Sequence, residues 1–206
     1  MYVKICGITN LNDARLAASL GADELGFNFF TGSPRYVEPL NVRAIVEHMP
    51  LRIRKTGVFV NESLKNMVEI AGVARLDGIQ LHGDESADFA ASVRDQTALR
   101  VIKAFRISKD FRVDEVGAYD VDAVLLDAYS KTRYGGTGEV FDWKIATEVK
   151  KLVPKLYLAG GLSDANVAEA ISAVDPYCID ACSCLESEPG IKDEVKLRNF
   201  LRNAGK

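Results

Sequence analysis

Two residues capable of proton transfer stand at the ends of short apolar segments. Cys6 follows residues 2–5, and Asp127 follows residues 123–126. A thiolate can accept a proton and a carboxylic acid can donate one, so the two side chains together suit a reaction with two proton transfers. Each also has a structural interpretation, Cys6 as a small buried hydrophobe and Asp127 as a carboxylate that caps a helix or fixes a loop.

Two segments in the last third of the chain suit the binding of a phosphate group. Gly160 and Gly161 end an apolar segment and are soon followed by Ser163, which we expect to start a helix. Glycine backbones and a helix N-terminus both offer N–H groups to an anion, although Gly-Gly also forms tight turns. The next apolar segment delivers Asp180 and is followed by Ser183. We therefore predict substrate contacts at Gly160, Gly161, Asp180 and Ser183.

Three further residues lie where a substrate could reach them. Arg35 belongs to the long segment 30–40, and its guanidinium could hold a carboxylate, although a solvated surface arginine explains it nearly as well. His82 ends a short apolar segment and could line a pocket, with a hydrogen-bonded structural histidine as the alternative. Gly136 lies in the glycine-rich segment 135–138, which lacks the Lys-Ser/Thr ending of a nucleotide P-loop and suits a mobile lid.

The spacing of the cysteines does not indicate a metal site, and Lys4 has a structural explanation. The spacing of Cys178, Cys182 and Cys184 matches no common zinc pattern, and no histidine lies nearby in the sequence. We expect free thiols and no metal or organic cofactor. Lys4 is two residues before Cys6, so it should point into the same space, where a buried ion pair would account for it.

Short β-branched segments alternate with segments of helical period along the whole chain, as is typical of consecutive βα units. We predict eight strands, at residues 2–6, 24–29, 55–60, 78–81, 100–105, 123–127, 156–159 and 178–181. Helices are expected at residues 10–20, 41–48, 63–71, 85–94, 109–116, 142–153, 163–173 and 193–201, several of them starting with a capping residue: Asn10, Asn41, Ser63, Asp142 or Ser163.

Eight such units predict a single-domain (β/α)8 TIM barrel over residues 1–206. The alternative is an open doubly wound sheet, which has the same local alternation. Two long segments, 30–40 and 128–140, follow strands rather than helices. In a barrel these are loops of the catalytic face, where Cys6 and Asp127 also end their strands.

Composition excludes several classes of protein. Apolar residues make up 48% of the chain and charged residues 27%, the balance of an ordinary folded domain. A net charge of −3 provides no general attraction to nucleic acid or to an anionic membrane, and we expect neither as a partner. We also find no secretory signal and no apolar stretch of about 20 residues, so we expect a cytoplasmic protein.

Taken in order along the chain, the motifs resemble those of the phosphoribosylanthranilate isomerase family of tryptophan biosynthesis. The similarity covers essentially the whole length and rests on KICGI at 4–8, GFNF at 26–29 with SPR at 33–35, GVFVN at 57–61, QLHG at 80–83, LD at 126–127, GGTG at 135–138 with FDW at 141–143, LAGGL at 158–162 and PGIKD at 189–193. Each motif alone is weak, but their shared order is specific.

The resemblance implies an Amadori rearrangement in which Cys6 is the general base, Asp127 the general acid and Arg35 the contact for the anthranilate carboxylate. The phosphate would lie against Gly160, Gly161 and Ser183. One departure concerns the segment after Asp180, where the family usually has Ser-Ser-Gly and this chain has Cys-Ser-Cys. If the glycine at this position has a positive φ or lets the backbone approach the phosphate closely, a cysteine there costs conformational energy and weakens phosphate binding.

Two other functions stay open at this point. Another phosphosugar barrel isomerase, such as the aminoaldose isomerase of the histidine pathway, would share the phosphate site but normally has carboxylates at both catalytic strand ends. A non-catalytic phosphosugar-binding barrel would keep Gly160 and Gly161 without needing Cys6 and Asp127. In each case the partner is a small phosphosugar, and we expect a monomer or a homodimer.

Overall fold

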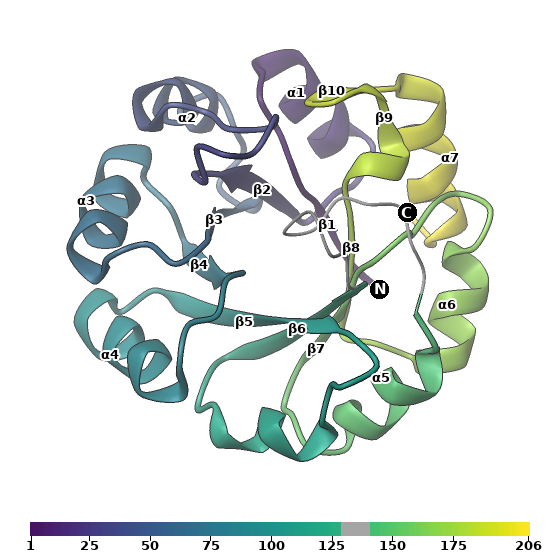
Figure 1. Ribbon diagram of the computed structural model, residues 1–206. Coiled ribbons are helices and arrows are strands. Elements are labelled where there is room, and N and C mark those ends of the chain that lie inside the picture. Colours follow the sequence, from purple (N-terminus) through teal and green to yellow (C-terminus); the bar gives the residue numbers. More distant parts are fainter. Residues whose placement is uncertain (129–140) are drawn as a thin grey trace.

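The computed structural model describes residues 1–128 and 141–206, and eight parallel strands in it close into a barrel (Figure 1). Neighbours in the barrel are also neighbours in the sequence, and the last strand pairs with the first. The closed ring confirms the predicted TIM barrel and shows that the open-sheet alternative is wrong. The strands are β1 (Tyr2–Ile5), β2 (Glu24–Asn28), β3 (Arg54–Phe59), β4 (Gly78–Leu81), β5 (Arg100–Ile107), β6 (Ala123–Ala128), β7 (Leu156–Leu158) and β8 (Cys178–Ala181).

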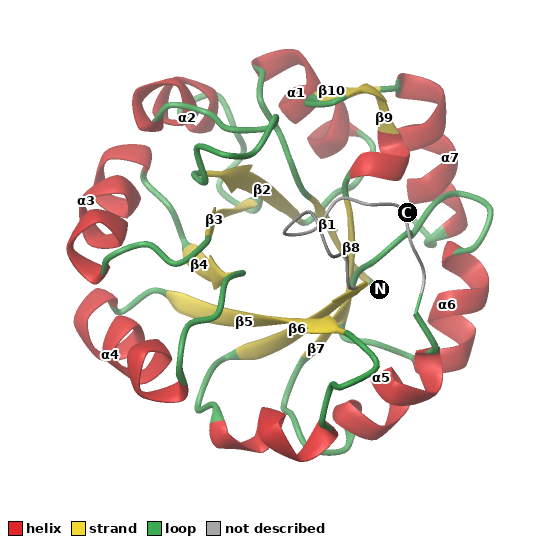
Figure 2. Cartoon of the chain, in the orientation of Figure 1, coloured by secondary structure: helices red, strands yellow, loops and turns green. Residues whose placement is uncertain are grey.

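Helices form a ring outside the strands, as Figure 2 shows. They are α1 (Leu11–Ser19), α2 (Pro39–Val46), α3 (Leu64–Ala74), α4 (Ala87–Thr97), α5 (Trp143–Lys150), α6 (Val167–Val174) and α7 (Glu194–Asn203), with 3-10 helices η1 (Val113–Ala118) and η2 (Ser183–Leu185). A short antiparallel hairpin of β9 (Glu186–Glu188) and β10 (Ile191–Lys192) follows η2. No helix in the described ranges has the length and apolar character needed to cross a membrane.

Strand residues alternate between two buried environments. In β1, Val3 and Ile5 belong to the apolar layer between strands and helices, whereas the fully buried Lys4 points into the barrel. A second apolar cluster, which includes Leu125 and Tyr157, lines the inside. This alternation is the two-residue period of a strand with both faces buried.

Several predicted helix starts were wrong, for reasons that lie in local chemistry. Helix α2 begins at Pro39 rather than Asn41, because the fixed φ of proline suits the first helical turn. Helix α6 begins at Val167, so the segment from Ser163 forms a turn instead. The helix expected at 109–116 is the 3-10 helix η1. Caps at Asn10, Ser63 and Asp142 are confirmed by hydrogen bonds to backbone N–H groups.

Candidate active site

The predicted catalytic residues lie at one end of the barrel because parallel strands all end on the same face. Cys6 directly follows β1, His82 directly follows β4, and Asp127 is the next-to-last residue of β6. Closure of the barrel brings these strands, far apart in the sequence, around one mouth (Figure 1). All three side chains are largely or partly buried there.

Asp127 is held by its own strand end and faces His82. Its Oδ1 accepts a hydrogen bond from the Ala128 N–H at 2.9 Å. Its Oδ2 lies 3.3 Å from Nε2 of His82, a nitrogen that otherwise has no hydrogen-bond partner among the described residues. One oxygen of the Asp127 carboxylate is therefore held by a backbone N–H, and the other faces the Nε2 atom of His82.

A hydrogen-bonded chain inside the barrel determines which way His82 presents its proton. Lys4 donates to Oε1 of Gln80 at 2.8 Å, which places the Gln80 amide nitrogen 2.8 Å from Nδ1 of His82. Because that amide can only donate, Nδ1 accepts, and the proton of the neutral ring is on Nε2. His82 thus directs an N–H toward Asp127.

Lys4 also forms the buried ion pair expected from its position, with Asp180 at 2.6 Å. Burial raises the pKa of Asp180 to about 7, although the charge of Lys4 opposes that rise. Oδ1 of Asp180 has no hydrogen-bond partner in residues 1–128 and 141–206. One oxygen of this carboxylate is therefore available to a hydroxyl group of a bound molecule.

The Cys6 thiol lies against two other residues of the mouth. A Cβ on Gly26 would be only 2.7 Å from Sγ of Cys6, so the space taken by the sulfur requires glycine on β2. Interaction with the thiol of Cys182, together with burial, raises the pKa of Cys6, while nearby Lys4 lowers it. In the pair, the thiol of Cys182 has the lowered pKa, through its interaction with Cys6 and the charges of Lys192 and Arg35.

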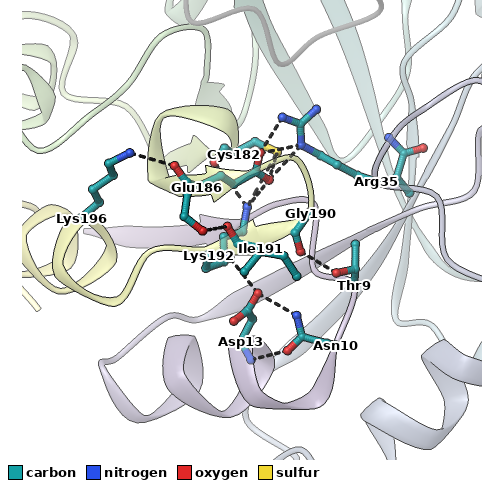
Figure 3. Close-up of polar contacts among 12 residues, drawn as sticks. Thr9, Asn10, Asp13, Arg35, Cys182, Glu186, Gly190, Ile191, Lys192 and Lys196 are labelled. Atoms are coloured by element: carbon teal, nitrogen blue, oxygen red, sulfur yellow. Dashed lines mark hydrogen bonds and ion pairs between the residues drawn. The ribbon is translucent and has the colours of Figure 1, made fainter.

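Arg35 belongs to a buried charged cluster that the sequence did not predict (Figure 3). Its Nε and Nη2 donate to the carboxylate of Glu186 at distances of 2.6 to 3.0 Å. Lys192 donates to the same carboxylate at 2.9 Å and lies 4.0 Å from Sγ of Cys182. The Arg35 guanidinium is thus held in one orientation beside Cys182, with Nη1 not engaged by Glu186.

The β9–β10 hairpin brings Glu186 and Lys192 to the mouth and is fastened to the start of α1. The hydroxyl of Thr9 donates to the Gly190 carbonyl at 2.5 Å, and the Lys192 N–H donates to Asp13 at 2.8 Å (Figure 3). Asp13 also lies in the first turn of α1 and contacts its capping residue. The hairpin was missed because a strand of two or three residues leaves little periodic signal in a sequence.

The predicted phosphate segment has the backbone geometry that requires glycine. Gly160 and Gly161 have φ values of 84° and 61°, and a Cβ on Gly160 would lie 2.6 Å from the Ala128 nitrogen. The N–H groups of Gly161 and Ser183 donate to no other group within the described ranges. However, α6 starts several residues after the glycines, so the prediction that they open a helix was wrong.

Cys184, at the position where the family usually has glycine, does not strain the backbone. Cys184 lies in η2 and is not among the described residues with positive φ, so the conformational penalty considered for a glycine position does not arise. Another predicted site residue, Gly136, lies outside the described residues. The other predicted side chains and glycines, from Cys6 to Ser183, surround the same end of the barrel.

Comparisons with known proteins agree with this geometry. The family model for N-(5'phosphoribosyl)anthranilate (PRA) isomerase matches residues 3–203. The N-(5'-phosphoribosyl)anthranilate isomerase of Geobacter metallireducens is 46% identical over 202 residues, which cover 98% of each chain. The crystal structure of phosphoribosyl anthranilate isomerase from Thermotoga maritima has a TM-score of 0.93 and 35% identity, covering 100% of this chain and 98% of that one.

A further similar structure contains a ligand. It is a phosphoribosyl anthranilate isomerase in complex with reduced 1-(o-carboxyphenylamino)-1-deoxyribulose 5-phosphate, with a TM-score of 0.89, 34% identity and coverage of 100% of this chain and 98% of that one. These matches confirm the resemblance found in the sequence. The chain belongs to the N-(5'-phosphoribosyl)anthranilate isomerase family.

Proposed function

We propose that this member of the tryptophan-biosynthetic isomerase family rearranges N-(5-phospho-β-D-ribosyl)anthranilate with Asp127 as general acid and Cys6 as general base. The product is 1-(2-carboxyphenylamino)-1-deoxy-D-ribulose 5-phosphate. The observation that carries the proposal is the presence of one acid and one thiol on separate strands around a single mouth.

The first step opens the sugar ring. The Asp127 carboxylic acid donates its proton to the furanose oxygen as the anthranilate nitrogen forms a C=N bond and the C1–O bond breaks. His82 orients the Asp127 carboxyl group, because its Nε2 lies 3.3 Å from Oδ2. The result is a cationic Schiff base, which withdraws electrons from C2.

The second step removes the proton from C2. Cys6 accepts that proton as a thiolate, the C2 electrons move toward the iminium nitrogen, and the resulting enolamine tautomerises to the ketone. The Schiff base is itself the electron sink, so neither step calls for a metal or an organic cofactor. Because interaction with Cys182 and burial raise the pKa of Cys6, the reactive thiolate fraction grows with pH.

The two anionic ends of the substrate match separate parts of the mouth. Arg35 is oriented by Glu186, and its remaining N–H groups would hold the anthranilate carboxylate. The N–H groups of Gly161 and Ser183, which donate to no group in residues 1–128 and 141–206, would hold the phosphate. Oδ1 of Asp180, which lacks a partner in the described part of the chain, would accept a ribose hydroxyl.

The Cys6→Ser variant tests the base assignment, because a hydroxyl of similar size is hardly ionised at neutral pH. We expect kcat to fall by about 10² to 10⁴ with KM nearly unchanged, measured by the loss of substrate fluorescence. Cys178→Ser is the matched control, since Cys178 is fully buried on β8 away from the mouth. It should lower the thermal midpoint while kcat persists. A near-native kcat in Cys6→Ser would reject the base assignment.

A further inference from the structure

Cys6 and Cys182 are the first residues after β1 and β8, the two strands that close the barrel. The parallel register pairs Lys4 with Asp180 and Ile5 with Ala181, and the Cys6 N–H donates to the Ala181 carbonyl at 2.9 Å. The residue after the last pair is a cysteine in both segments. Backbones of adjacent strands lie about 4.8 Å apart, which falls within the Cα separation of about 4.4 to 6.8 Å that a disulfide spans.

The two thiols also lie close enough for each to be the largest influence on the pKa of the other. A Cβ on Gly7 would lie 2.7 Å from Sγ of Cys182, so this sulfur packs directly over the backbone that follows Cys6. Both cysteines are free thiols and partly exposed at the mouth.

The charges around Cys182 favour its reaction with an oxidant. Sγ of Cys182 lies 4.0 Å from the ammonium group of Lys192 and 3.8 Å from the Glu186 carboxylate, and the Arg35 guanidinium contacts the same carboxylate. The positive charges of Lys192 and Arg35 therefore exceed the negative charge of Glu186 near this sulfur. The charge of Lys4 acts on the thiol of Cys6. Its interaction with Cys6 and these cations lower the pKa of Cys182, and thiolates are the species that react with peroxides.

We propose that Cys6 and Cys182 form a peroxide-sensitive thiol pair whose disulfide reversibly inactivates the enzyme. The Cys182 thiolate attacks hydrogen peroxide, the O–O bond breaks, and a sulfenic acid forms with release of hydroxide, which is protonated to water. The Cys6 sulfur then attacks that of Cys182, the S–O bond breaks, and the Cys6 proton leaves with the hydroxide as a second water. Two thiols are oxidised to one disulfide while one peroxide is reduced to two waters.

The functional consequence rests on the proposed role of Cys6 as the base, since a disulfide removes its thiolate. The partner thiol also departs from the usual sequence of the family at this place. The segment 182–184 reads Cys-Ser-Cys where the family usually has Ser-Ser-Gly, so the partner thiol is absent from the usual family pattern.

The test oxidises the reduced, desalted protein with hydrogen peroxide and follows three quantities: the number of titratable thiols in denaturant, the linked peptides after digestion without reductant, and the isomerase rate. We expect the four thiols of the chain to fall by two, a peptide joining Cys6 to Cys182, and loss of activity that dithiothreitol restores. Cys184→Ser is the matched control, because it keeps the pair and alters a thiol two residues away. It should form the same linked peptide at the same rate.

Cys182→Ser should form no linked peptide, and its inactivation by peroxide should be about tenfold slower and not reversed by dithiothreitol, because Cys6 alone oxidises beyond the sulfenic acid. Each rate is compared with that of the same variant before oxidation. A linkage of Cys182 to Cys184, or equally fast and fully reversible inactivation of Cys182→Ser, would overturn the thiol pair. A Cys6 to Cys182 disulfide with retained activity would instead support the pair and reject Cys6 as the base.

Discussion

The two ends of the barrel interior both contain buried carboxylates, but those carboxylates are satisfied to different degrees. At the amino ends of the strands, the fully buried Glu24 accepts hydrogen bonds from Thr56 at 2.6 Å, Tyr157 at 3.1 Å and Arg100 at 3.3 Å. Burial and the charge of Glu24 raise the pKa of Tyr157, so its hydroxyl stays a donor. The Glu24 carboxylate is thereby fully paired, while Nη1 of Arg54 at the start of β3 is a buried donor without a hydrogen-bond partner among the described residues.

At the carboxyl ends, the polar groups are incompletely paired. Oδ1 of Asp180 and Nε2 of His82 have no hydrogen-bond partner among the described residues, and Asp127 meets His82 at 3.3 Å without a well-aligned bond. Buried polar groups left without partners destabilise a fold by about 1 to 3 kcal/mol each. The comparison indicates that one end of the barrel maintains the closed sheet, whereas the other keeps donors and acceptors free for a substrate.

The largest expected effect is the loss of activity in Asp127→Asn. An amide has nearly the same shape but cannot protonate the ring oxygen, so kcat should fall by about 10² to 10⁴ or more. The thermal midpoint should stay close to that of the unmodified enzyme. Normal turnover by this variant would show that the mouth does not use Asp127 as its acid.

Glu24→Gln tests the opposite end of the barrel. The amide nitrogen would face donors from Thr56, Tyr157 and Arg100, so we expect the free energy of unfolding to fall by about 2 to 4 kcal/mol, measured by denaturant titration. The kcat should change by less than about twofold, because no substrate group reaches this layer. Glu69→Gln, at an exposed position of α3, is the control and should leave both quantities unchanged. A loss of kcat without a loss of stability would contradict the assignment.

The effect of His82→Phe on kcat should lie between those of Asp127→Asn and Glu24→Gln. It removes the N–H that faces Asp127 and also the acceptor of the Gln80 amide, while it keeps a flat ring in the same space. Without the N–H that orients Asp127, kcat should fall roughly tenfold with little change in KM, which corresponds to about 1.4 kcal/mol of lost transition-state stabilisation. If kcat is unchanged and only the thermal midpoint falls, His82 is a structural residue.

The smallest expected effect is a shift in pH dependence for Cys182→Ser. Interaction with the thiol of Cys182 is the largest cause of the raised pKa of Cys6, because it favours the protonated form of Cys6. A serine hydroxyl is a neutral partner at every pH used, so the pKa of Cys6 should fall. The rise of kcat/KM with pH should then occur at lower pH than in the unmodified enzyme. An unchanged profile, or one displaced to higher pH, would show that the two thiols are not coupled.

The sequence alone determined the number of βα units and placed Cys6 and Asp127 at the ends of strands. Eight apolar segments of strand length predict eight parallel strands, and a residue that ends such a segment lies at the mouth whichever strand it follows. Cys6 and Asp127 could therefore be selected without knowledge of any contact. The capping residues predicted the helix starts less well. Helix α2 starts at Pro39 instead of the predicted Asn41, and the segment from Ser163 is a turn instead of the start of a helix.

Only the tertiary structure decided which groups meet at that mouth. Arg35 and Glu186 are 151 residues apart in the sequence, and the ion pair between them depends on where the hairpin after β8 is fastened. The proton on Nε2 of His82 depends on Gln80, whose orientation is set by Lys4 from another strand. Cys6 meets Cys182 because the last strand closes the barrel in register with the first. Such contacts arise from closure and register, which a periodic pattern within one segment does not specify.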